Sequence, residues 1–140
     1  MKKMLTKDFY KYILTISIIT IVFRISLSSL LIIETWNFIF IPPLGYFLLM
    51  FLSGWYFGKK DYEYLPFNDI GFRYNLSTFL VFFTISYSMF FLGQMSKYEP
   101  RIIIDYTFLI WGIVLTLHLI FYNKVKSNNI KGLPKEDIFD

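Results

Sequence analysis

Arg24 is the residue whose position most needs a chemical explanation, because it lies in the apolar stretch IVFRISLS, Ile21–Ser28. A charge at the centre of a lone membrane-spanning helix costs at least about 2.5–3.5 kcal/mol on insertion scales, so a partner or a function is expected. Counting along helices from their outer ends places Arg24 roughly 13 Å deep and Asp105 roughly 5 Å deep, a difference that the arginine stem can mostly close. We therefore expect Asp105 to be the partner, with Glu34 as the alternative. Arg24 then either latches the first apolar segment to the fourth or offers a positive site to an anion.

Small and hydroxyl side chains recur at helical spacing in three of the apolar segments. In the first segment Ser17, Thr20 and Ser28 share a face with Arg24, because they are three or four residues apart. The corresponding sets in the third and fourth segments are Ser77, Thr84 and Ser88, and Asp105, Gly112 and Thr116. Such stripes let membrane helices approach closely and form hydrogen bonds. We expect them to pack the helices together, and a path for solute is the alternative.

The remaining titratable chemistry is sparse. His118 is the single histidine, and it lies on a different helix face from Asp105, thirteen positions earlier. We expect His118 to be a packing residue, with pH sensing as the alternative. The chain has no cysteine, which excludes disulfides and thiolate metal sites. No HExxH, GxSxG or Walker pattern occurs. We therefore expect no enzyme, no metal site and no cofactor.

The composition is that of a membrane protein. Of 140 residues, 56% are hydrophobic, 22% are aromatic and only 17% are charged, against about 25% charged in soluble domains. The apolar residues form four segments of 20 to 24 residues: 10–33, 37–57, 74–93 and 102–122. A helix of that length crosses a hydrocarbon core of about 30 Å, and helix satisfies the backbone there. The sequence predicts an all-α integral membrane protein, a single four-helix bundle with a tail at 123–140.

The distribution of Lys and Arg predicts the orientation. Eleven lie before the first segment, in the second connection or after the fourth segment, whereas only Lys97 and Arg101 lie on the opposite side. By the positive-inside rule we expect both termini to be cytoplasmic. We expect the membrane to be a bacterial inner membrane. The basic surplus suits attraction to anionic lipid headgroups. Nucleic-acid binding is not expected, because no basic cluster lies on a soluble domain.

Pro42 and Pro43 fall about a turn and a half inside the second segment. Each lacks a backbone donor, and Pro42 disfavours helix at Ile41. Either the helix begins at these prolines, with the preceding residues along the outer interface, or it kinks there. We expect the kink, since a later start leaves a short span.

The third and fourth segments resemble the 2TM-domain family of small bacterial membrane proteins over residues 72–122. WGIVLTLH, Trp111–His118, matches the family's Trp-Gly pair and the His six residues beyond the Gly. FRYNL, Phe72–Leu76, is similar to the family's aromatic-rich opening, but Asn75 stands where the family tends to have His. The resemblance implies a signalling or membrane-organising accessory protein.

A second resemblance is to the small four-helix fluoride channels. Arg24 followed by PPLGYFLLMFLSG, Pro42–Gly54, is similar to their first-helix Arg and their second helix. Pro42, however, replaces the pore asparagine, and the third segment lacks the Thr-Thr-Phe-Ser element. The charge bias also opposes the dual topology to which those channels tend.

These observations together favour a regulatory or structural membrane subunit that acts through protein contacts. We expect its central loop and its tail, including LPKEDIF at 133–139, to take part, and we expect a homo-oligomer or a membrane-protein partner. The alternative is an oligomeric ion channel, pore-former or small-solute transporter.

Overall fold

The computed structural model describes residues 6–62 and 67–131, with side chains described for 6–62 and 70–124. Its elements are α1 (Lys7–Ile32), a short 3-10 helix η1 (Trp36–Phe38), α2 (Ile41–Asp61), α3 (Phe67–Phe91) and α4 (Arg101–Lys131). The described residues contain no strand. Four helical stretches, the second of them including η1, are long and apolar enough to cross a membrane. The prediction of an all-α chain with four candidate spans is confirmed, and α4 continues past the predicted end of its segment at Tyr122.

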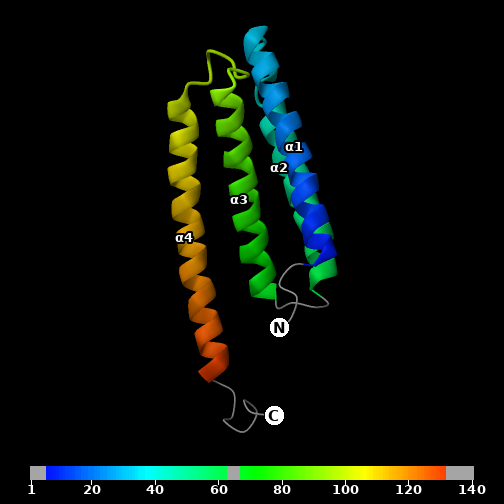
Figure 1. The fold of residues 1–140 in the computed structure, drawn as a ribbon, viewed down its shortest axis with the longest axis vertical. Coiled ribbons are helices and arrows are strands. Elements are labelled where there is room, and N and C mark those ends of the chain that lie inside the picture. Colours follow the sequence, from blue (N-terminus) through cyan, green and yellow to red (C-terminus); the bar gives the residue numbers. More distant parts are fainter. Residues whose placement is uncertain (1–5, 63–66, 132–140) are drawn as a thin grey trace.

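The helices run alternately up and down, so that α1 begins and α4 ends at the same end of the molecule (Figure 1). α1 packs against both α2 and α3, and α2 also touches α3. α4 makes its helix packing against α3, and it stands apart from α1 and α2 in Figure 1. The arrangement is therefore open, with α4 held to the other helices through α3.

α1 starts at a side-chain cap and buries one continuous face. The Thr6 hydroxyl accepts a hydrogen bond from the Phe9 amide at 3.0 Å, which satisfies one of the otherwise unpaired donors of the first turn. The buried residues recur every three or four positions: Phe9, Tyr12, Ile16, Thr20, Arg24, Ser28 and Leu31. The predicted face that carries Thr20, Arg24 and Ser28 is the one turned toward the other helices.

The start of α2 differs from the predicted kink. The helix begins at Ile41, so that Pro42 and Pro43 occupy its first turn. Amide groups in the first turn have no acceptor within the helix, so prolines there cost no hydrogen bond. Trp36–Phe38 forms the separate 3-10 turn. The prolines therefore start the helix, and the expectation of a kink was wrong.

Two clusters of buried side chains form the core. One joins α1 to α3 near the start of α1, and it contains Phe9, Tyr12, Ile16, Ile70 and Tyr74. The other joins α3 to α4, and it contains Phe79, Phe82, Phe83 and Ile104. The second cluster is extended by Phe23, Tyr46 and Trp111 into an aromatic layer. We refer to the six aromatic residues of this set as the aromatic layer: Phe23, Tyr46, Phe79, Phe82, Phe83 and Trp111.

Candidate functional site

Arg24 is buried and held by α3 and by the loop that follows it. Only 7% of the residue is exposed. Its Nε donates to Ser86 Oγ at 2.9 Å, and its Nη1 donates to Glu99 Oε1 at 3.0 Å. The guanidinium carbon also lies 5.0 Å from the centroid of the Phe82 ring. Glu99, not Asp105, is the partner of Arg24, and the predicted pairing with Asp105 was wrong.

Glu99 reaches Arg24 because its loop folds back onto α1. Gly93 ends α3 with a positive φ of 68°, a conformation that glycine adopts without strain. The Ser96 amide then donates to Ser28 Oγ at 2.6 Å, and the Glu99 amide donates to the Ser96 carbonyl at 2.9 Å. These bonds fix the loop beside the buried face of α1, so that Glu99 itself is 7% exposed.

The electrostatics of Glu99 reflect two opposing effects. Burial removes water from the carboxylate and raises the pKa of Glu99 above its usual range, while the positive charge of Arg24 and the hydrogen bond that it donates act against that rise. The net direction is upward. The pair is therefore a buried ion pair whose attraction is set against a substantial loss of hydration.

The two other acids considered for Arg24 have their own partners. Asp105 accepts a hydrogen bond from Tyr87 Oη at 2.6 Å and lies 3.4 Å from Arg101 Nε, one turn away on α4. Glu34 accepts from Tyr98 Oη at 2.9 Å on the molecular surface. The ion pair of Arg24 thus ties α1 to the α3–α4 loop, and it does not latch α1 to α4.

The predicted hydroxyl stripes are only partly at helix contacts. In α1, Thr20 and Ser28 are buried and Ser17 is partly buried. In α3, Ser77 is partly buried, whereas Thr84 and Ser88 are exposed. The buried hydroxyls of α3 are Thr78 and Ser86. Successive helical residues are about 100° apart around the axis, so choosing a neighbouring hydroxyl selects a different face.

The predicted stripe on α4 is divided, because Asp105 bonds to Tyr87 of α3 whereas Gly112 and Thr116 lie outside the contact with α3. Thr116 is exposed, and its hydroxyl donates to the Gly112 carbonyl at 2.8 Å. A Cβ placed on Gly112 would meet nothing within 4 Å. Gly112 and Thr116, four residues apart, therefore form an open flank of small side chains on α4, which we call the α4 flank.

His118 lies against α3, where a packing residue would lie. Its Nδ1 is 3.4 Å from Asn75 Nδ2, and the Phe72 ring meets its imidazole edge-on at 5.8 Å between centroids. Trp111 Nε1 donates to Asn75 Oδ1 at 3.1 Å. Asn75, Trp111 and His118 thus form one polar network between α3 and α4.

Asp61 forms a second polar centre that the sequence reasoning missed. It is 1% exposed at the end of α2, and it accepts hydrogen bonds from Thr6 Oγ1 at 2.7 Å and from Tyr74 Oη at 2.8 Å. Tyr12 Oη and Thr78 Oγ1 bond to each other nearby. An acid at a helix C-terminus is disfavoured by the helix dipole. The position of Asp61 could therefore have indicated from the sequence that this carboxylate has stabilising partners. Asp61 joins the start of α1, the end of α2 and the first turns of α3.

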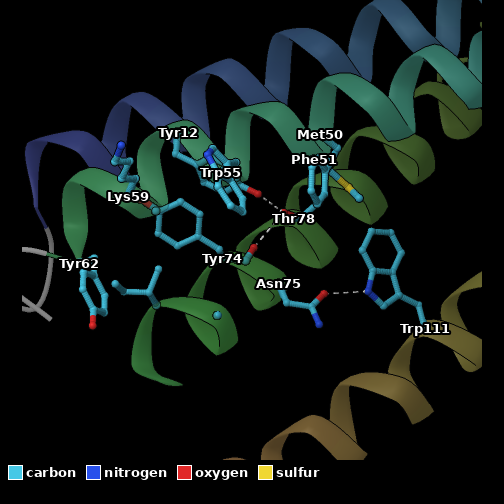
Figure 2. Close-up of a pocket in the computed structure, with 14 residues that line it drawn as sticks. Tyr12, Met50, Phe51, Trp55, Lys59, Tyr62, Tyr74, Asn75, Thr78 and Trp111 are labelled. Atoms are coloured by element: carbon cyan, nitrogen blue, oxygen red, sulfur yellow. Dashed lines mark hydrogen bonds between the residues drawn. The ribbon is translucent and has the colours of Figure 1, made fainter. Parts of the chain in front are cut away.

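A groove of about 680 Å³ opens between α2 and α3 at the end of the molecule where α1 begins. Figure 2 shows Met50, Phe51 and Trp55 on one side, Tyr74 and Thr78 on the other, and Trp111 reaching in from α4. The α2 side also includes Gly54, Gly58 and Lys59. Gly54 and Gly58 form a GxxxG pair, a recognised signal for close approach in membrane helices that the sequence reasoning missed.

The described residues contain no group of three or more His, Asp or Glu side chains able to hold a metal ion. Comparison of the chain with family models, with curated proteins and with solved structures finds no match in any of the three. The class that the structure defines is an all-helical protein with four helices able to span a membrane. Its candidate functional features are the buried ion pair, the α4 flank and the groove.

Proposed function

We propose that this chain is a multi-pass membrane accessory protein, a regulatory or structural subunit that contacts another membrane protein through α4. The observation that carries the proposal is the isolation of α4, which packs against α3 while the α4 flank of Gly112 and Thr116 stays open. The other three helices form a supporting frame.

The α4 flank has the chemistry of a membrane helix contact. Small residues four positions apart let two backbones come close, which drives helix association in lipid through packing rather than through the hydrophobic effect. The Thr116 hydroxyl already bonds to its own helix, so a partner helix covers no unsatisfied polar group there. A second copy of this chain is the first partner to test.

The frame is fixed at both ends by polar contacts. Near the ends of α1 and α3 the Arg24–Glu99 ion pair ties α1 to the α3–α4 loop. At the opposite end Asp61 joins α1, α2 and α3 through Thr6 and Tyr74. A frame held in this way supports α4 in a constant position for a partner.

The charge distribution supports an inner-membrane orientation with both ends in the cytoplasm. Lys7 and Lys11 in α1 and Lys59 and Lys60 in α2 lie at one end of the molecule, whereas Arg101 begins α4 at the other. This segregation follows the positive-inside rule. The central loop and the tail peptide at 133–139 are also expected to contact partners; residues 63–66 of that loop and the tail peptide lie outside the described residues.

The channel and transporter alternative has less support from the geometry. Arg24 is engaged by Glu99 and Ser86 and is not presented to an anion. The aromatic layer lies along the helices between this ion pair and Asn75 of the α3–α4 network. These two features favour the accessory role over a conducting path.

The proposal is tested by measuring association in liposomes with donor- and acceptor-labelled copies, and in native membranes by chemical cross-linking. We expect Gly112→Leu to reduce the associated fraction about tenfold, because the new side chain blocks close approach. Gly45→Leu is the matched control, since a Cβ there also meets nothing within 4 Å but lies on α2. Equal association of both variants with wild type, or no association of wild type in either assay, would overturn the proposal.

A further inference from the structure

The groove between α2 and α3 has the features of a lipid site. We propose that it binds one anionic glycerophospholipid of the cytoplasmic leaflet, with the phosphate at Lys59 and an acyl chain lying along the groove toward Met50. The inference does not rest on the partner contact proposed for the α4 flank, although it shares the proposed orientation of the chain.

The charge at one end of the groove is placed for a phosphate. Lys59 lies in the last turn of α2 and lines the groove. Within the described part of the chain, no hydrogen bond or ion pair engages its ammonium group. Lys60, the next residue, donates instead to Tyr56 Oη at 2.8 Å. Lys11 is 3.4 Å from Asp8. Lys59 is thus available to an anionic headgroup.

The length of the groove matches one leaflet. Lys59 lies nine positions after Met50, which corresponds to about 13 Å along α2. Half of a hydrocarbon core of about 30 Å is roughly 15 Å. With Lys59 at headgroup depth, the groove would end near the centre of the bilayer, where an acyl chain ends.

The interior of the groove suits a hydrocarbon chain. Met50, Phe51, Trp55 and Ile70 supply apolar surface. A Cβ on Gly54 would meet nothing within 4 Å, so the missing side chain leaves space beside α2. The volume of about 680 Å³ lies inside the range of roughly 300–1,000 Å³ that is usual for small-molecule sites.

The polar groups in the groove are already paired with one another. Tyr12 Oη bonds to Thr78 Oγ1, and Asn75 bonds to Trp111 Nε1. An acyl chain against these walls therefore covers no unsatisfied donor or acceptor, so burying them carries no large desolvation cost. Charge at the headgroup end and hydrocarbon surface beyond it together select an anionic lipid over a neutral one.

The test is native mass spectrometry of the intact protein released from detergent with added phosphatidylglycerol or phosphatidylcholine. For wild type we expect retention of one phosphatidylglycerol at concentrations where phosphatidylcholine is lost. Lys59→Gln should reduce the phosphatidylglycerol-bound fraction about tenfold, whereas Lys60→Gln, on the neighbouring paired lysine, should leave it within twofold. Gly54→Leu should abolish retention by filling the groove, and Gly45→Leu should preserve it.

Three results would overturn the proposal. The first is equal retention of the two lipids by wild type. The second is equal loss in Lys59→Gln and Lys60→Gln, which would indicate general charge attraction at this end of the protein. The third is lipid retention that survives Gly54→Leu, which would place the lipid elsewhere. A protein helix as occupant is recognised if Gly54→Leu instead abolishes association between copies in liposomes.

Discussion

The pairing of Arg24 with Glu99 predicts a coupling free energy between these two residues that a pairing of Arg24 with Asp105 would not produce. At a separation of about 4 Å and an effective dielectric constant near 20, two unit charges attract by about 4 kcal/mol. The Nη1–Oε1 distance of 3.0 Å and the burial of both side chains place this pair in that regime. Allowing for relaxation, we expect a coupling free energy of about 2–4 kcal/mol between Arg24 and Glu99.

The coupling is measured with a double-mutant cycle built from Arg24→Gln, Glu99→Gln and the double variant. Single variants understate the attraction, because removing the Glu99 charge also recovers part of the hydration that burial takes from it. The cycle cancels that contribution. The readout is the free energy of unfolding in mixed micelles as the fraction of dodecyl sulfate rises, followed by tryptophan fluorescence.

The control cycle replaces Glu99→Gln by Asp105→Asn. Asp105 is paired with Tyr87 and Arg101, so its effect should add to that of Arg24→Gln within about 0.5 kcal/mol. A coupling with Asp105 that equals or exceeds the coupling with Glu99 would refute the assignment of the ion pair.

Three further results are expected. Tyr74→Phe removes one of the two hydrogen bonds to the buried Asp61 and should lower the free energy of unfolding by about 1–3 kcal/mol. Tyr98→Phe, on the surface, should change the free energy of unfolding by less than about 0.5 kcal/mol. Similar losses in both variants would contradict the role of Asp61. Because burial raises the pKa of Glu99 when folded, the folded state retains a proton that the unfolded state releases near pH 4.3. The free energy of unfolding of wild type relative to Glu99→Gln should therefore fall as pH rises from about 4.3 to the raised pKa of Glu99 in the folded state, by at most about 1.4 kcal/mol per pH unit, and then level off. A difference that rises with pH would contradict this sign. Liposomes containing wild type should show no ion or proton flux, and flux that disappears in a still-folded Arg24→Gln variant would make the protein a channel or transporter.

Much of the architecture could be predicted from the sequence because it depends on local pattern. The lengths of the apolar segments set the helices, and the spacing of Thr20, Arg24 and Ser28 identified the buried face of α1. The start of α2 was harder, because two prolines are compatible with either a kink or a first turn. The 3-10 turn at Trp36–Phe38, which separates the loop from α2, has no strong sequence signal.

The partner of Arg24 could not be predicted from depth along the helices. Depth counting led to Asp105 within a segment and to Glu34 at the end of one, whereas Glu99 lies in the α3–α4 loop, in the stretch SKYEP, Ser96–Pro100. Its position depends on the turn at Gly93 and on the bond from Ser96 to Ser28, which are tertiary features. In the same way, the predicted Ser77 is only partly buried, whereas Thr78, the next residue, is buried and bonds to Tyr12.

The most direct test of the proposed accessory role is photo-cross-linking from α4 in native membranes. A photoreactive residue at position 116 lies on the α4 flank, and one at position 114 replaces Val114, which is also exposed. Two helical residues turn through about 200°, so position 114 faces away from position 116. We predict a discrete protein adduct from position 116 that is lost in Gly112→Leu, and lipid adducts alone from position 114. Lipid adducts alone from both positions would contradict a protein contact through α4.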